Sequence, residues 1–230
     1  MENVADNKTR IDLDHRIGIE LVRSGEMELL LRLYADLFFE REPLTRYFAL
    51  DKERMISIAR QMHAEPENNP VEKRLCWMAK DASPAGRVAG FIACDDLAAD
   101  VEPAFPDDMA DEDQKKLYAM MRLLGEIREP CLDRIAAGEG KCLHIAAIGV
   151  VPEYEGQGIA TRLLQRAITE APRLGFTGAY AECTSTASLK CHEKVGFIRI
   201  HAARLNEIRI DGTRPYADCD IDVSIAWRAL

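Results

Sequence analysis

The chain has 230 residues, of which 47% are hydrophobic and 30% are charged, and its formal net charge at pH 7 is −9. This composition is typical of a soluble globular protein that is long enough to bury a sizeable core. The acidic balance disfavours nucleic acid as a partner and mildly favours cationic molecules, and no apolar run approaches membrane-spanning length.

The cysteines indicate a reducing compartment. There are seven of them, scattered and without a CxxC pair, which favours free thiols over a disulfide framework or a zinc site. The N-terminal stretch MENVADNKTR lacks the apolar core of a secretion signal. We therefore expect a cytoplasmic protein that forms one domain over residues 1–230, acts as a monomer, binds neither membrane nor nucleic acid, and needs no metal.

The N-terminal part predicts a strand followed by helices. Residues 14–23 are expected to form the strand, and Ser24 to cap a helix whose apolar residues recur at helical spacing. Pro43 should end this helix, because the residue before a proline is disfavoured in the helical region, which leaves Glu42 extended at the helix exit. A second helix is expected over about 52–65.

The middle of the chain predicts a hairpin and an insertion. Residues 74–80 and 87–94 read as antiparallel strands joined by a turn. Residues 98–112 are acidic, contain two prolines and are expected to form a surface insertion. A polar helix over about 113–137 should follow.

The C-terminal half alternates strands and helices. The apolar run 142–151 predicts a buried strand that Pro152 stops, and the apolar positions from Ile159 onward fit a helix that Gly175 closes. The further expected elements are a strand over 178–184, a short helix over 186–195, and strands over 197–202 and 220–227. This order predicts a mixed α/β domain around one sheet.

The stretch EGQGIATRLL, residues 155–164, predicts an anion site. A strand, a proline and a glycine-rich turn lead into a helix, whose first backbone N–H groups have no internal partner. Gly156 and Gly158 would let phosphate oxygens approach without a Cβ in the way. The dinucleotide pattern GxGxxG is not met, because Thr161 stands at its third glycine, and GxxxxGK[ST] is absent. The alternative is a tight turn whose glycines only serve packing.

The surrounding stretch IGVVPEYEGQGIATRLLQRAI is similar to the acetyl-CoA-binding signature of the GNAT acetyltransferase superfamily, a loop of the form (Arg/Gln)-x-x-Gly-x-(Gly/Ala). Gly158 and Ala160 match its last two positions. Glu155 departs from the first, and we expect its carboxylate to point to solvent. KVGF (194–197) and VAGFIAC (88–94) also resemble family segments. The resemblance implies the GNAT fold: a mixed, mostly antiparallel central sheet that is splayed at the acetyl-CoA site and flanked by helices.

The resemblance implies acetyl-CoA as co-substrate and a set of residues that hold it. The backbone of Ile148 and Val150 would pair with the pantetheine arm, and one of their amides could stabilise the oxyanion. Arg162 and Lys190 are candidate contacts for the outer phosphates or, equally, solvated helix charges. The amides expected to bind the diphosphate are those of Gly156, Gln157, Gly158, Ile159, Ala160 and Thr161.

The segment LYADLFFEREPLTRYFAL (33–50) resembles the FFxxEPL segment of invertebrate-type arylalkylamine N-acetyltransferases, which acetylate dopamine, octopamine, tyramine, tryptamine and serotonin. In that group the glutamate before the proline is the general base, which is Glu42 here. Arg41 departs from the acidic residue that is common before it. A carboxylate can take the proton of an ammonium substrate and attract the cation, and the negative end of a helix would favour proton uptake. The alternative is a surface glutamate before a turn.

ECTSTASLKCHEKVGF (182–197) also matches that subfamily, in which hydroxyl groups after the strand assist proton movement. The candidates are Thr184, Ser185 and Ser188, although Ser185 could equally cap the following helix. His192 occupies the position where the GNAT pattern often has a tyrosine that protonates the leaving thiolate, and we consider it as the acid.

Other side chains have an ordinary alternative. His144 resembles a position where some arylalkylamine acetyltransferases carry proton-relay histidines, but we favour a satisfied core residue. A covalent route through Cys183 or Cys191 is disfavoured, because no neighbouring base is evident. The aromatics that could hold a substrate ring, with core packing as the default, are Phe39, Tyr47, Phe48 and Tyr180.

The sequence therefore predicts an enzyme that transfers an acetyl group from acetyl-CoA to the primary amine of an arylalkylamine. Two alternatives stay open. The same fold and cofactor could serve a polyamine, another small amine or a protein N-terminus, or the domain could bind coenzyme A without catalysis.

Overall fold

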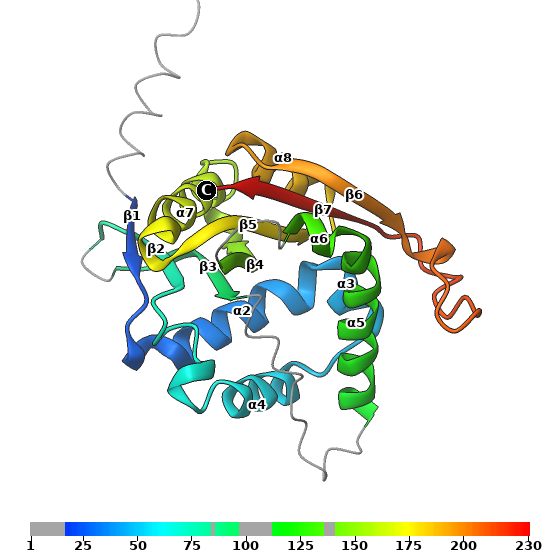
Figure 1. The fold of residues 1–230 in the computed structure, drawn as a ribbon. Helices are drawn as coiled ribbons and strands as arrows, with labels where there is room; N and C mark the ends of the chain where they lie inside the picture. The colour runs from blue at the N-terminus through cyan, green and yellow to red at the C-terminus, as the bar shows by residue number, and fades with distance from the viewer. Residues whose placement is uncertain (1–16, 84–85, 97–111, 136–140) are drawn as a thin grey trace, which may run out of the picture.

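A seven-stranded sheet in the order β1-β2-β3-β4-β5-β7-β6 forms the centre of the computed structural model, which describes residues 17–83, 86–96, 112–135 and 141–230 (Figure 1). Its strands are β1 (Ile17–Leu21), β2 (Cys76–Asp81), β3 (Val88–Asp96), β4 (Lys141–Val150), β5 (Phe176–Cys183), β6 (Ile198–Arg204) and β7 (Asp222–Ala229). Only β4 and β5 run parallel, and the other neighbouring strands are antiparallel. The prediction of a mixed, mostly antiparallel sheet is confirmed.

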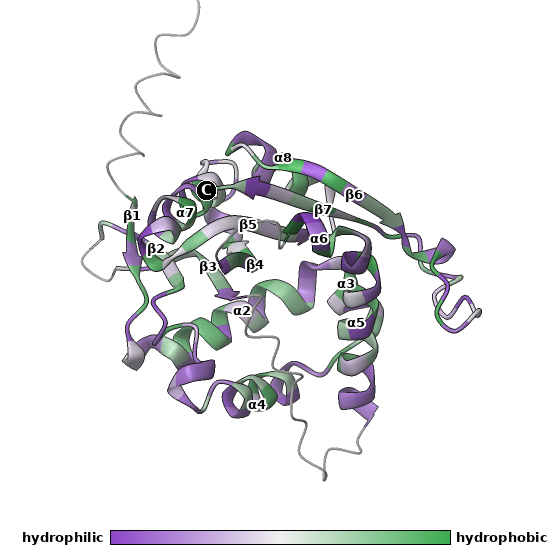
Figure 2. Cartoon of the chain, in the orientation of Figure 1, coloured by the Kyte–Doolittle hydropathy of each residue, from purple (hydrophilic) through white to green (hydrophobic). Residues whose placement is uncertain are grey.

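Helices cover both faces of the sheet (Figure 1). One side carries α2 (Met27–Arg41), α3 (Pro43–Phe48), α4 (Lys52–Met62) and α5 (Glu112–Arg128), and the other carries α7 (Ile159–Glu170) and α8 (Thr186–Lys194). Alternate residues of a strand serve the two layers: Trp77 and Ala79 belong to the core under α7, whereas Met78 packs with residues of α2. Figure 2 shows hydrophobic and hydrophilic residues on each helix, as expected for helices with one buried face.

The sheet opens between β4 and β5. Beside β3, strand β4 stays paired as far as Val150, whereas its pairing with β5 in the described structure covers residues 141–144. A bulge adds Ala146 to β4, because Ala147 faces Ala93 and Ile145 faces Cys94 across β3. We call the space between residues 145–150 of β4 and 181–183 of β5 the wedge. In the described structure, residues 145–150 of β4 therefore have no paired strand on the β5 side.

Close packing on β4 fixes the end of α2. A Cβ added at Gly149 would lie 2.9 Å from Leu37 Cδ1 and 2.8 Å from Phe91 Cε1, so a larger residue there would force these side chains to shift. Leu37 stands one helical turn before the C-terminal end of α2. This contact holds the residues after α2 over the wedge.

The prediction that the helix ends before Pro43 is confirmed, and a further helix that was not predicted begins at Pro43 itself. Glu42 is extended, with φ −77° and ψ 126°, as expected, but Pro43 is the first residue of α3. Proline is favoured there because its fixed φ suits a helix and its missing N–H is not needed. The prediction that Ser24 caps α2 is wrong, because Ser24 begins a short 3-10 turn (Ser24–Glu26) that precedes the helix.

The helix predicted over 113–137 is interrupted. It ends as α5 at Arg128 and continues as a 3-10 turn (Glu129–Cys131) and the short α6 (Leu132–Ile135), with Pro130 at the break. The expected acidic insertion lies outside the described residues, except for Glu112, which begins α5. In the part of the chain that the structure describes, every helix is too short or too polar to cross a membrane.

Candidate active site

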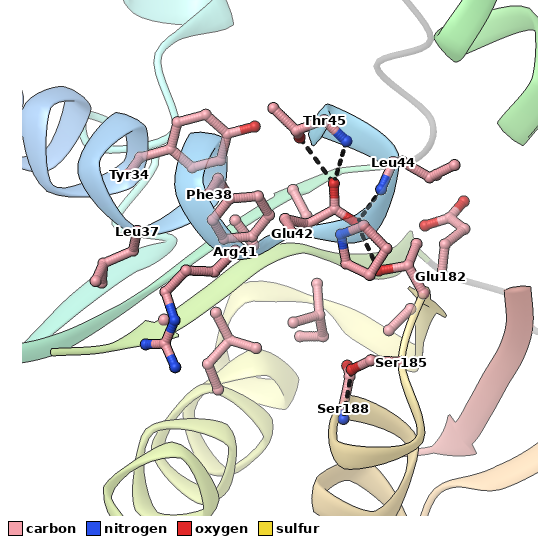
Figure 3. A pocket seen from close by; sticks show the side chains of 18 of the residues that line it. Tyr34, Leu37, Phe38, Arg41, Glu42, Leu44, Thr45, Glu182, Ser185 and Ser188 are labelled. Carbon is pink, nitrogen blue, oxygen red and sulfur yellow. Dashed lines mark hydrogen bonds between the residues drawn. The ribbon is translucent and has the colours of Figure 1, made fainter. Parts of the chain in front are cut away.

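A cavity of about 400 Å³ lies at the wedge. Its walls come from the end of α2 and the start of α3 on one side, and from β4, the residues after β5 and α8 on the other. Figure 3 shows Glu42 beside Leu44 and Thr45 in one wall, with Ser185 and Ser188 across from it. The cavity thus brings together residues from both halves of the sequence.

Glu42 is held by four donors. Its Oε1 accepts from the amide of Leu44 at 3.1 Å and from the Thr184 hydroxyl at 2.6 Å. Its Oε2 accepts from the amide of Thr45 at 2.6 Å and from the Thr45 hydroxyl at 2.7 Å. The side chain therefore has a single, well-defined orientation in the cavity wall. Burial and the negative charge of Glu42 also raise the pKa of nearby Tyr34 to about 12.

The local chain explains this orientation. Glu42 is the N-cap of α3, whose first free amides point at the carboxylate. The expectation that the negative end of α2 acts on this group is therefore wrong in its geometry, because the side chain turns to the positive end of the next helix.

The residues after β5 bring hydroxyl groups to the cavity. Thr184 directly follows β5 and donates to Glu42, although the two residues are 142 positions apart. Ser185 caps α8, since its Oγ accepts from the amide of Ser188 at 3.2 Å. The Ser188 side chain lies in the cavity wall. Of the three predicted hydroxyls, Thr184 is thus the one that contacts the carboxylate.

The glycine loop has an open backbone at the start of α7. Gly156 and Gly158 have φ values of 73° and 77°, and a Cβ added at either would meet nothing within 4 Å. Gly158 is the N-cap of α7 and supplies no side chain to its first amides, which include those of Ile159 and Ala160. The Tyr154 hydroxyl anchors the loop by donating to Asp81 at 2.7 Å.

The two predicted outer-phosphate contacts differ. Arg162 is half-buried and its Nη2 donates to the backbone carbonyl of Ile17 at 2.7 Å, so this guanidinium ties α7 to β1. Lys190 is exposed on α8. Among the described residues, no three His, Cys, Asp or Glu side chains are grouped to hold a metal ion.

Comparison with known proteins agrees with this geometry. Residues 27–197 match the family model described as the acetyltransferase (GNAT) family. The chain belongs to the GNAT acetyltransferase family. Members of this family are N-acetyltransferases that use acetyl-CoA.

Solved structures share the fold. A mosquito arylalkylamine N-acetyltransferase like 5b is 22% identical, with a TM-score of 0.75, over 93% of this chain and 100% of the other. The C-terminal condensation domain of Ebony, solved with beta-alanyl-dopamine, is 16% identical, with a TM-score of 0.74, over 94% and 99%. A Drosophila melanogaster polyamine N-acetyltransferase that forms N-acetylagmatine is 22% identical, with a TM-score of 0.67, over 93% and 100%. At these identities the likeness concerns the fold.

Two departures from the family patterns compensate each other in this GNAT enzyme. Arg41 at the end of α2 and Glu155 in the glycine loop form an ion pair, with Nη1 and Oε1 2.5 Å apart. Both side chains are slightly less than half exposed, so Glu155 faces Arg41 as well as solvent. Sequence reasoning noted each departure separately, and their opposite charges were the available signal that they meet.

His192, at the GNAT tyrosine position, is buried in the cavity wall. Its Nδ1 lies 2.9 Å from the carbonyl of Ser188 and therefore carries the proton, whereas Nε2 has no hydrogen-bond partner in the described structure. Burial lowers the pKa of His192. The ring is thus neutral near pH 7 and offers an acceptor, which gives no support to His192 as proton donor.

His144 is not a plain core residue. It lines the cavity, its two ring nitrogens face Asp95 and Glu182, and it stacks on Tyr180 with ring centroids 4.6 Å apart. Sequence reasoning missed both acidic partners, because they lie on different strands.

A second cavity of about 250 Å³, which we call the chamber, adjoins the first. Its walls are mostly apolar side chains of α2, α4 and α5, including Leu31, Met55, Ile58 and Leu117. The residues that line both cavities are Tyr34, Thr45, Met120, Ala146 and Ala147.

The predicted ring-holding aromatics divide between several places. Phe39 lines the chamber. Tyr47 and Phe48 instead pack with each other and with Tyr216, and Tyr180 stacks on His144.

Proposed function

We propose that this GNAT enzyme acetylates the primary amine of an arylalkylamine of the dopamine, octopamine, tyramine, tryptamine or serotonin type, with Glu42 as general base. The contact between Glu42 Oε1 and Thr184 Oγ1, 2.6 Å in the cavity wall, carries this proposal. It joins a carboxylate from the acceptor-side segment to a hydroxyl at the wedge, where the family resemblance puts the thioester.

Glu42 and Thr184 can remove the first proton together. The carboxylate attracts the ammonium form of the acceptor. Because the Thr184 hydroxyl donates to Glu42, its lone pairs are available to take a proton from the amine while its own proton passes to the carboxylate. The direct transfer to Glu42 requires that one of its four donors give way.

The rest of the reaction uses the wedge. Acetyl-CoA supplies the acetyl group as a thioester, and its diphosphate is held by the amides at the start of α7. The β4 amide of Ile148 or Val150 stabilises the charge on the carbonyl oxygen as the neutral amine attacks. After the attack, the nitrogen gives up its second proton, and the leaving thiolate receives it. We assign its transfer to the Ser188 hydroxyl, because His192 presents an acceptor.

The chamber supports an acceptor with one cation and an apolar body. The chamber shares Thr45, which donates to Glu42, with the cavity, and we infer that the body of an amine held at Glu42 extends into the chamber. A dicationic acceptor such as agmatine would also need a free anion at its far end. The carboxylate there, Asp95, already faces His144, and Lys73 lines the same chamber.

A panel of amines tests the proposal through thiol release from acetyl-CoA. We expect tyramine, dopamine, octopamine or tryptamine to give higher kcat/KM than agmatine, spermidine or a peptide N-terminus. A preference for one of the latter would contradict the acceptor class while leaving the family intact. Firm coenzyme A binding without turnover of any amine would indicate a non-catalytic module.

A further inference from the structure

Four charged side chains meet at the narrow end of the wedge. Asp95 on β3, His144 on β4 and Glu182 on β5 come from adjacent strands, and Arg128 comes from α5. The ring of His144 lies between the two carboxylates, with Nδ1 3.0 Å from Asp95 Oδ1 and Nε2 2.6 Å from Glu182 Oε2. Arg128 Nη1 lies 3.6 Å from Glu182 Oε1. We call these four residues the charge cluster.

The sheet register explains why they meet. Asp95 is the β3 partner of His144, and Tyr180 is its β5 partner in the last pair before the strands part. Glu182 follows two residues later on the same face of β5, so it reaches His144 across the opening. The charge cluster therefore spans β3, β4 and β5 where the backbone ladder between β4 and β5 stops.

Geometry gives His144 its charge. An ionised carboxylate accepts hydrogen bonds, and each ring nitrogen faces a carboxyl group, so both nitrogens carry a hydrogen when Asp95 and Glu182 are ionised. The side chains of His144 and Glu182 are only 20% and 7% exposed, so water screens this pair little, whereas the Asp95 side chain is 50% exposed. The imidazolium and Arg128 balance the two carboxylates.

We propose that His144 is a positioning residue whose fixed imidazolium ties β4 to β5 and so sets the width at which acetyl-CoA fits between them. The side-chain bridge replaces the backbone hydrogen bonds that the wedge lacks. A ring that stays charged near neutral pH does not relay protons there, which distinguishes this role from acid–base catalysis. The inference rests on the family's use of acetyl-CoA and does not depend on which amine is the acceptor.

The pKa shifts of these groups agree with a charged His144. Burial opposes a charge on His144, but Asp95 and Glu182 raise its pKa to about 10. Burial likewise opposes ionisation of Asp95 and Glu182, yet the charge of His144 lowers the pKa of both, with Arg128 contributing.

Side-chain nitrogen NMR on the complete, ligand-free protein tests the charge directly. The His144 signals are assigned by their loss in His144→Gln. We expect both ring nitrogens to stay protonated up to about pH 9, far above the ordinary histidine value of about 6.5. A ring that titrates near 6.5 would overturn the proposal, whatever the enzyme acetylates.

Acetyl-CoA binding, measured by calorimetry without acceptor, tests the positioning. His144→Gln should weaken affinity about tenfold, and His144→Lys, which keeps a cation that can bridge two carboxylates, should stay within about threefold of the wild type. His201→Gln on β6 is the control and should bind normally. The pH dependence of kcat should not move in any variant. Equal affinity in the Gln and wild-type proteins, or a shifted pH profile in His144→Gln, would contradict a positioning role. If His144→Gln does not fold, Glu182→Gln takes its place, with the same weakening expected.

Discussion

At the scale of single residues, the four donors around Glu42 give the most direct test of catalysis. Glu42→Gln removes the base and puts an amide N–H₂ against donors that need an acceptor. We expect kcat to fall by about 10²–10⁴ at pH 7, with recovery at higher pH as the amine loses its proton unaided. The weakened cap of α3 should lower the free energy of unfolding by about 0.5–2 kcal/mol.

Glu40→Gln is the matched control, because Glu40 is exposed on α2 two residues earlier. Its kcat and stability should match those of the wild type. Rates measured from pH 6 to 9 that are the same in Glu42→Gln and wild type would remove Glu42 from the mechanism.

The glycine loop offers a second test at this scale. Asparagine tolerates the positive φ of Gly158, whereas a β-branched residue would be strained there, so Gly158→Asn fills the open side of the loop with little strain. We expect acetyl-CoA affinity to fall by about tenfold or more, which corresponds to losing one or two charge-assisted hydrogen bonds.

Gly175→Asn, beyond the other end of the same helix, is the control. Gly175 also has positive φ and open space around it. Its variant should bind acetyl-CoA normally with a similar melting temperature. Equal affinity loss in the two variants would mean that the loop effect is structural.

At the scale of elements, the Arg41–Glu155 pair connects α2 to the glycine loop. Removing either partner should change the free energy of unfolding by less than about 1 kcal/mol, because both side chains are nearly half exposed. Acetyl-CoA binding should respond in opposite directions. Glu155→Gln releases Arg41 towards the diphosphate and should raise affinity about threefold, whereas Arg41→Gln leaves an unpaired carboxylate beside it and should lower affinity about tenfold.

The double variant Arg41→Gln/Glu155→Gln removes both charges and should return close to wild-type affinity. Calorimetry at low and high salt measures the acetyl-CoA affinity of the wild type, the two single variants and the double variant. The differences in affinity between them should shrink at high salt. Single variants that both weaken binding would show that the pair itself, and not the separate charges, supports the cofactor.

Most elements could be predicted from periodicity and turn residues, and the exceptions are the cap of α2, the start of α3 and the break after α5. Pro43 signals the end of α2, as predicted, but the local sequence does not show that a further helix begins there, and the packing of α3 against α5 and Tyr216 supports that helix. Pro130 lies inside the predicted polar helix and is itself a local signal of the break, because an interior proline removes a helix hydrogen bond. At the start of α3, by contrast, tertiary contacts decided the conformation.

At the scale of the whole molecule, the charge cluster makes stability depend on pH. The pKa of His144 is raised from 6.5 to about 10, so its contribution is complete below about pH 6.5 and is lost as the pH rises towards 10. We expect denaturant unfolding to show a decrease of roughly 2–4 kcal/mol over that range. On the acid side, the lowered pKa values of Asp95 and Glu182 mean that their contribution is lost as those groups protonate.

His144→Gln should flatten the alkaline decrease, and His201→Gln should keep it. An alkaline decrease that persists unchanged in His144→Gln would have to come from other groups, which would contradict the assignment.

The contacts in the site between residues far apart in the chain could not be predicted from the sequence. Family resemblance nominated Glu42 and Thr184 separately, but their contact depends on α2 being seated on Gly149. The charge cluster depends on the register of β3 against β4, which the bulge at Ala146 shifts by one residue. A one-residue slip would turn Asp95 to the other face of the sheet. Neither the packing of α2 on Gly149 nor the bulge at Ala146 has a local sequence signature strong enough to predict it.

In the proposed mechanism, the group that receives a proton also anchors the first turn of α3. In the proposed relay the proton reaches Glu42 along its Thr184 contact, on Oε1, while the two Thr45 donors stay on Oε2. Thr45 also lines both the cavity and the chamber. The wall that the two cavities share is therefore held by the oxygen that does not gain the proton, so the base can be recharged in every cycle without loosening the first turn of α3.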